Sequence, residues 1–175
     1  MRKNRDPLKL LGFLLLVYAP FLGFRVARTA GDEKVYVAQA LEMEKAGTWF
    51  LQKFMGAADY FKGPLHYILV RIGSAIFGHS MWATVWMNLA LVLGGSYSLY
   101  RMSRRYLPER PRGLALFAGA AFGASAGIYG FVFASQMEIE LACFYAIAIN
   151  LFERSRLRQG RSASSCRAAD WAFWA

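Results

Sequence analysis

The sequence predicts an all-α integral membrane protein with about four transmembrane helices. Hydrophobic residues make up 57% of the 175 residues, and aromatic residues make up 16%. Three long stretches, 10–24, 72–100 and 113–137, contain no Lys, Arg, Asp or Glu. A bilayer core about 30 Å thick takes roughly 20 apolar helical residues, so these stretches have the length of membrane helices. A soluble domain would show more charge and shorter, periodic apolar runs.

The formal net charge of +10 does not indicate nucleic-acid binding. The basic residues punctuate the apolar stretches in three clusters and form no continuous basic face of the kind that follows a phosphate backbone. Such clusters mark the cytoplasmic side of membrane proteins, so we expect all three, and both chain termini, to be cytoplasmic. The clusters are Arg2, Lys3, Arg5 and Lys9; Arg101, Arg104, Arg105, Arg110 and Arg112; and Arg154, Arg156, Arg158, Arg161 and Arg167.

This orientation decides which apolar segments span the membrane. Clusters on the same side require an even number of crossings between them, yet three apolar segments separate the first cluster from the second. The segment 64–78 is expected not to span, because it is short, opens with Gly63-Pro64 and contains Arg71. The predicted spans are 8–26, 81–101, 113–133 and 137–154, and the outer loop 27–80 carries interfacial helices at about 32–46 and 64–78.

Other local sequence features bear on signal-peptide cleavage, on cysteine chemistry and on helix packing. A basic N-terminus before an apolar run is also typical of a signal peptide, but no clear small-x-small cleavage site follows, which favours an uncleaved first helix. Cys143 and Cys166 lack the close spacing that predicts a metal site or a disulfide. Gly119, Gly123 and Gly127 have the small-xxx-small spacing that permits close helix contact.

Two features of chemical interest fall in the first outer loop. Asp32 and Glu33 open the helix predicted at 32–46. Asp32 either caps that helix or acts as a functional carboxylate, and Glu33 also suits the first turn. Lys62 precedes Gly63-Pro64, where an ammonium beside unsatisfied helix N–H groups favours an anion such as phosphate. The alternative for Lys62 is a lysine that snorkels to the interface.

A third feature lies at the outer end of the fourth span. Glu138 and Glu140 border the bilayer, where carboxylates are costly unless they face water, a partner or a site. The alternative is a solvated helix start. His66 and His79 are too isolated in the sequence to predict metal ligands. Each signal is weak, but the charge-derived topology places all three features on the same side.

The order of these residues resembles the polyprenyl-phosphate-sugar glycosyltransferases of the type C fold, which include protein O-mannosyltransferases and lipid A aminoarabinose transferases. The similarity covers about residues 8–153. Each motif is short, and their order and spacing make the resemblance fairly specific. The matching positions are Gly31-Asp32-Glu33, Tyr36, Met43, Gly47-Thr48-Trp49, Lys62-Gly63-Pro64-Leu65, Tyr67 and Phe77-Gly78.

The resemblance implies an inverting sugar transfer outside the cytoplasm, either metal-independent or assisted by a divalent metal, with no other cofactor. Asp32, with Glu33 beside it, would be the catalytic carboxylate that takes the acceptor's proton. Lys62 would pair with the donor phosphate as it leaves. Glu138 or Glu140 would stand for the family's acidic residue in the second outer loop. Aminoarabinose transferases carry Glu and Pro where this chain has Phe61 and Gly63, which disfavours that substrate.

The resemblance therefore predicts a bacterial inner-membrane enzyme that moves a sugar from a polyprenyl-phosphate donor to a lipid, glycan or protein acceptor. Residues 1–158 would form its N-terminal transmembrane part, and the tail 159–175 does not resemble the family's continuation. We expect a truncated, split or frameshifted product, or a partial sequence, that is inactive alone. The alternative is a non-catalytic small membrane protein, such as an assembly or lipid-binding subunit. A transporter component is disfavoured because the apolar runs contain essentially no ionisable residue.

Overall fold

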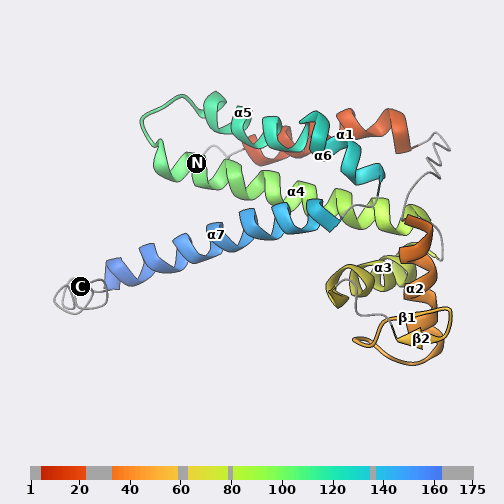
Figure 1. Ribbon diagram of the computed structural model, residues 1–175. Helices are drawn as coiled ribbons and strands as arrows, with labels where there is room; N and C mark the ends of the chain where they lie inside the picture. The colour runs from red at the N-terminus through yellow and green to blue at the C-terminus, as the bar shows by residue number, and fades with distance from the viewer. Residues whose placement is uncertain (1–4, 23–32, 59–62, 79–80, 135–136, 163–175) are drawn as a thin grey trace.

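The computed structural model describes residues 5–22, 33–58, 63–78, 81–134 and 137–162. These residues are mostly helical, as the sequence predicts. Figure 1 shows helices lying side by side in a bundle, with further helices and a small hairpin gathered at one end. The elements are α1 (Asp6–Leu22), α2 (Glu33–Lys45), β1 (Lys53–Phe54), β2 (Ala57–Ala58), α3 (Pro64–Phe77), α4 (Met81–Tyr106), α5 (Arg112–Gly123), α6 (Ala126–Phe133) and α7 (Met137–Ser162).

Helix α4 is the centre of the structure, because it contacts every other described helix. Helices α1, α5, α6 and α7 surround it to form the bundle (Figure 1). At one end of the bundle, α2, α3 and the hairpin form a separate layer, which we call the α2–α3 layer. The opposite end, which we call the arginine end, carries the last turns of α4, the start of α5 and the C-terminal half of α7 (Figure 1).

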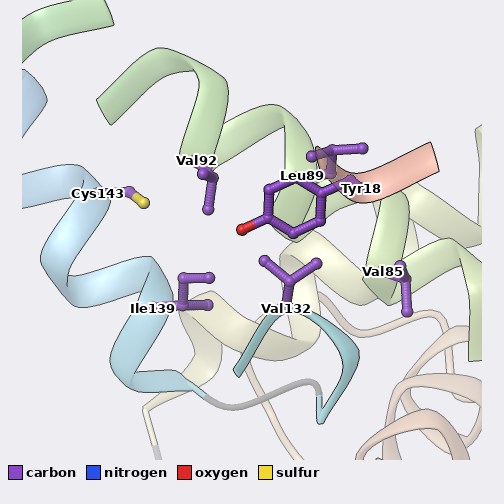
Figure 2. Close-up of a cluster of buried hydrophobic side chains, with 7 residues drawn as sticks. All are labelled: Tyr18, Val85, Leu89, Val92, Val132, Ile139 and Cys143. Carbon is purple, nitrogen blue, oxygen red and sulfur yellow. The ribbon is translucent and has the colours of Figure 1, made fainter. Parts of the chain in front are cut away.

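Two buried clusters hold the bundle together. In the first, Tyr18 reaches from α1 between α4, α6 and α7 (Figure 2). Its hydroxyl donates a hydrogen bond of 2.8 Å to the buried carbonyl oxygen of Gly123, so the buried phenol is satisfied. The second cluster lies nearer the arginine end and consists of Leu10, Leu14, Tyr100 and Ala115. The other members of the first cluster are Val85, Leu89, Val92, Val132, Ile139 and Cys143.

Glycines let α5 approach α4 closely, as the small-residue spacing predicts. A Cβ atom added at Gly119 would lie 2.7 Å from the carbonyl oxygen of Ser96, and one at Gly123 would lie 2.5 Å from the Ser96 hydroxyl. Both distances are far below van der Waals contact. Gly127 differs, because a Cβ atom there would meet nothing within 4 Å. The predicted close contact therefore involves the first two glycines of the motif.

The segment predicted as one helix over 113–133 is broken in the structure. Helices α5 and α6 meet at an angle of 44°, with Ala124 and Ser125 between them. The Ser125 hydroxyl donates a hydrogen bond to the carbonyl oxygen of Phe122, which offers that carbonyl a partner outside the helical ladder. Gly123 ends α5 and Ser125 precedes α6, and Gly and Ser residues are common at such kinks.

To cross a bilayer, a helix needs both sufficient length and sufficient apolar content. Among the described residues, no helix meets both requirements by itself. Two bent pairs meet them together, α5 with α6 at 44° and α3 with α4 at 108°.

The hairpin is an element that the sequence did not predict. Strands β1 and β2 pair antiparallel, and the turn between them places Met55 at φ 52° and Gly56 at φ 79°. Two successive positive φ angles are typical of a tight hairpin turn. The carboxylate of Glu42 on α2 accepts hydrogen bonds of 3.1 Å from both turn N–H groups. The hairpin therefore depends on a helix residue that lies more than ten positions earlier in the chain.

Candidate functional site

The α2–α3 layer packs through one buried face on each helix. On α2 the spacing of Tyr36, Ala40 and Met43 places three buried side chains on one side, as expected for positions three and four residues apart. Helix α3 begins with Pro64 directly after Gly63, because proline has no N–H to lose at a helix start. Its buried face includes His66, Tyr67 and Val70.

His66 and Glu140 form a buried pair that links α3 to α7. The Nδ1 atom of His66 lies 2.7 Å from the Oε1 atom of Glu140. His66 is 1% exposed and Glu140 is 4% exposed. A buried carboxylate is tolerated when a partner compensates for its lost hydration. This pair therefore explains how Glu140 is accommodated inside the structure.

Two tyrosines complete the surroundings of the histidine. The ring centroids of Tyr36 and His66 are 4.7 Å apart at 79°, and those of His66 and Tyr67 are 5.7 Å apart at 73°. Such edge-on arrangements are favourable between aromatic rings. We call Tyr36, His66, Tyr67 and Glu140 the His66 cluster. It joins α2, α3 and α7 at a single point.

The hydrogen bonding of His66 leaves one ring nitrogen available. An ionised carboxylate only accepts hydrogen bonds, so Nδ1 carries the hydrogen and donates to Glu140 in that state. The Nε2 atom is also buried, and it has no hydrogen-bond partner among the described residues. Buried polar atoms without a partner are uncommon. The cluster therefore holds a polar atom that can bond to a further group.

The predicted site residues differ in burial and in whether the structure describes them. Glu140 is part of the His66 cluster, whereas Glu138 is exposed on the same helix. Glu33 is the first residue of α2, and its side chain lies outside the described part. Asp32 and Lys62 lie outside the described residues. In the sequence, each of them stands four positions before a member of the cluster, Asp32 before Tyr36 and Lys62 before His66.

Sequence reasoning missed His66, which looked isolated because its partner Glu140 is 74 positions away. One signal pointed toward it. A carboxylate at the edge of an apolar run needs a partner, and His66 lies on the same predicted side as Glu140. Choosing His66 required knowledge of which face of α3 meets α7.

Arg71 lies in the same layer, where its guanidinium makes two contacts with one loop. Its guanidinium carbon is 3.7 Å from the centroid of the Trp49 ring, a close cation–π contact. The guanidinium also donates a hydrogen bond to the carbonyl oxygen of Thr48. The charge that interrupts the apolar segment 64–78 therefore contacts residues of the loop between α2 and β1.

A metal ion was considered because a divalent metal is compatible with the resemblance. Within the ranges that the structure describes, His, Cys, Asp and Glu side chains nowhere form a group of three or more that would hold a metal. His66 and Glu140 form a pair of such residues. Asp32 and the side chain of Glu33 lie outside those ranges.

Comparison with known proteins identifies the family of this chain. Residues 61–162 match the family described as dolichyl-phosphate-mannose-protein mannosyltransferase. The chain is 31% identical over 164 residues to an undecaprenyl phosphate-alpha-4-amino-4-deoxy-L-arabinose arabinosyl transferase of Pseudomonas savastanoi pv. phaseolicola. That alignment covers 89% of this chain and 30% of the relative, so the chain spans about a third of the relative's length. No solved structure matches. The family match covers more than half of the sequence, and the chain belongs to the dolichyl-phosphate-mannose-protein mannosyltransferase family of glycosyltransferases.

Proposed function

We propose that this chain is the N-terminal membrane part of an enzyme that transfers a sugar from a polyprenyl-phosphate donor to a lipid, glycan or protein acceptor. The observation that carries the proposal is the His66 cluster, which joins α2, α3 and α7. Asp32 and Lys62 each precede a cluster member by four positions in the sequence. The cluster would hold these segments together so that a base and a phosphate-binding lysine act on one donor.

In this proposal, the chemistry is shared between two residues of the first loop. Asp32 accepts the proton of the acceptor hydroxyl while the new glycosidic bond forms. Lys62 neutralises the charge that develops on the donor phosphate as its bond to the sugar breaks. Glu33, next to Asp32, is the second carboxylate to be tested. Glu140 acts through His66 and positions α3, rather than touching the sugar.

We also propose that the bundle crosses a bacterial inner membrane, with the α2–α3 layer outside and the arginine end in the cytoplasm. Large apolar side chains are exposed along α1, α5 and α7, an arrangement that suits lipid rather than water. The engaged charge of Arg71 supports α3 as an interfacial helix. The side chains in question include Leu8, Leu16, Phe117, Leu141, Tyr145 and Phe152, which are all at least 61% exposed.

The membrane placement is tested by the accessibility of single cysteines. Ala57 in the hairpin and Glu109 after α4 are both exposed. With Cys143 and Cys166 replaced by serine, Ala57→Cys should react with a membrane-impermeant maleimide in intact spheroplasts. Glu109→Cys should react after the membrane is permeabilised. Labelling of Glu109→Cys in intact spheroplasts would contradict the placement.

Lys62 tests the donor phosphate interaction. Removing one preorganised charge-stabilising group commonly lowers kcat by about 10²–10³-fold, so Lys62→Gln should have an effect of this size in the complete gene product. The matched control is Lys53→Gln in β1 of the same layer, which should transfer normally. Transfer is measured from a radiolabelled polyprenyl-phosphate sugar. Equal activity of Lys62→Gln and wild type would favour the non-catalytic alternative.

The identity of the sugar is a separate question. The Pseudomonas relative is named for a 4-amino-4-deoxy-L-arabinose donor, whereas Phe61 and Gly63 depart from the pattern of that group. We therefore propose a hexose or another pentose. Parallel assays with polyprenyl-phosphate mannose and polyprenyl-phosphate aminoarabinose decide between them, and turnover of aminoarabinose alone would overturn this choice.

A further inference from the structure

A charged pocket lies at the arginine end, between the start of α1 and the last turns of α4. Its volume is about 250 Å³, below the roughly 300–1,000 Å³ of pockets for drug-sized ligands. Three of its five lining residues are arginines, and none is acidic. The lining consists of Pro7, Tyr100, Arg101, Arg104 and Arg105.

The guanidinium of Arg105 is held in place from one side. Its Nη2 atom donates a hydrogen bond of 3.3 Å to the amide oxygen of Asn150 on α7. The amide nitrogen of Asn150 in turn lies 3.4 Å from the hydroxyl of Ser98. The Nη1 atom of Arg105 is buried and has no hydrogen-bond partner within the described ranges. A buried charged donor without a partner is costly, which points to an anion as the absent partner.

No acidic residue is among those that line the pocket. Asp6, next to Pro7, is buried, does not line the pocket and has an interaction of its own. Glu153 on α7 lies 3.5 Å from the Nε atom of Arg156 and also hydrogen-bonds to Tyr106, which raises the pKa of that phenol. The charged residues of the lining are therefore all positive, which suits an anionic ligand.

We propose that this pocket binds the phosphate of an anionic phospholipid head group. Guanidinium groups form charge-assisted, often bidentate hydrogen bonds with phosphate oxygens. Basic pockets between membrane helices on the cytoplasmic side are suited to anionic head groups. The inference rests on the proposed membrane placement and is independent of the transfer chemistry at the other end. The simpler alternative is that Arg104 and Arg105 compensate the dipole at the end of α4, which predicts no preference for a ligand.

The test measures ligand binding by the full chain in a neutral detergent. Short-chain phosphatidylglycerol, short-chain phosphatidylcholine and inorganic phosphate are titrated separately, and binding is followed by thermal stabilisation and native mass spectrometry. The pocket variant is Arg101→Gln/Arg104→Gln. The control is Arg110→Gln/Arg112→Gln, which removes the same charge from exposed positions at the same end. A second pocket variant, Arg101→Lys/Arg104→Lys, keeps the charge and loses the bidentate geometry, in case the first fails to fold.

We expect wild type and control to bind phosphatidylglycerol about tenfold or more tightly than phosphatidylcholine. Both lipids offer phosphate oxygens, but phosphatidylcholine also carries a cationic choline group that the arginines repel, and a difference of one charge-assisted interaction corresponds to about that factor. Both pocket variants should lose this preference. If inorganic phosphate binds in an arginine-dependent way and neither lipid is preferred, the pocket is a phosphate site whose ligand is a free ion. Equal losses in pocket and control variants, or no binding by the wild type, would overturn the proposal. Neither result depends on sugar transfer, so the proposed enzymatic function is judged separately.

Discussion

Replacing Asp32 with asparagine in the complete gene product is expected to lower sugar transfer by about 10²–10⁴-fold, the usual contribution of a general base. The substitution is chosen because Asp32 immediately precedes α2 and also suits a helix cap. Asparagine caps helices about as well as aspartate, but it has no carboxylate to accept a proton. The variant therefore removes the proposed chemistry while leaving the structural role intact.

The measurement is single-turnover transfer from a labelled polyprenyl-phosphate sugar, with protein amount and thermal stability measured on the same samples. Glu33→Gln serves as the neighbouring comparison and identifies which of the two carboxylates is the base. Asp32→Ala adds the loss of the cap, about 0.5–2 kcal/mol of stability. If Asp32→Asn transfers at the wild-type rate, Asp32 is a cap and the proposed mechanism is wrong.

Breaking the His66–Glu140 pair is expected to produce the largest loss of stability. The variant His66→Phe keeps an aromatic ring beside Tyr36 and Tyr67 but leaves the Glu140 carboxyl buried without its partner. Such an orphaned polar group costs about 1–3 kcal/mol, and more when it is charged. The matched control is Glu138→Ala, an exposed position on the same helix, where a change of at most about 0.5 kcal/mol is expected.

The decisive comparison is the double variant His66→Phe/Glu140→Leu. Replacing both partners of a buried pair with apolar groups is often nearly neutral, so the double variant should recover much of the stability lost by His66→Phe. Unfolding is followed by SDS titration and by thermal melting in detergent, and the coupling is obtained from the double-mutant cycle. Additive effects of the two substitutions would show that the 2.7 Å contact does not link α3 to α7 energetically.

The same variants separate positioning from catalysis. If Glu140 acts only through His66, the double variant should regain transfer along with stability. If transfer stays low while stability recovers, one of the two polar side chains touches the substrate or the reacting groups. The buried Nε2 atom of His66, which has no partner among the described residues, makes His66 the first residue to examine in that case.

Much of the fold was predictable, because the relevant signals are local. Apolar runs and their flanking charges indicated helices near the observed α1, α2, α3, α4 and α7. Gly119 and Gly123 indicated close packing. The break between α5 and α6 was not predicted, because an apolar run shows its total length more clearly than a kink at Ser125. The hairpin was also missed, since its turn depends on the distant Glu42.

By itself, the sequence determined the helical class, the family motifs and the grouping of the acidic and basic residues along the chain. These properties depend on residue type and spacing, which are visible in a single chain. The tertiary structure decided which side chains meet. It distinguished buried Glu140 from exposed Glu138, paired Glu140 with His66 and brought the start of α1 and the end of α4 together at the arginine pocket. Such choices depend on the rotation of each helix about its axis, because a shift of one position turns a side chain by about 100° and exchanges a buried partner for an exposed one.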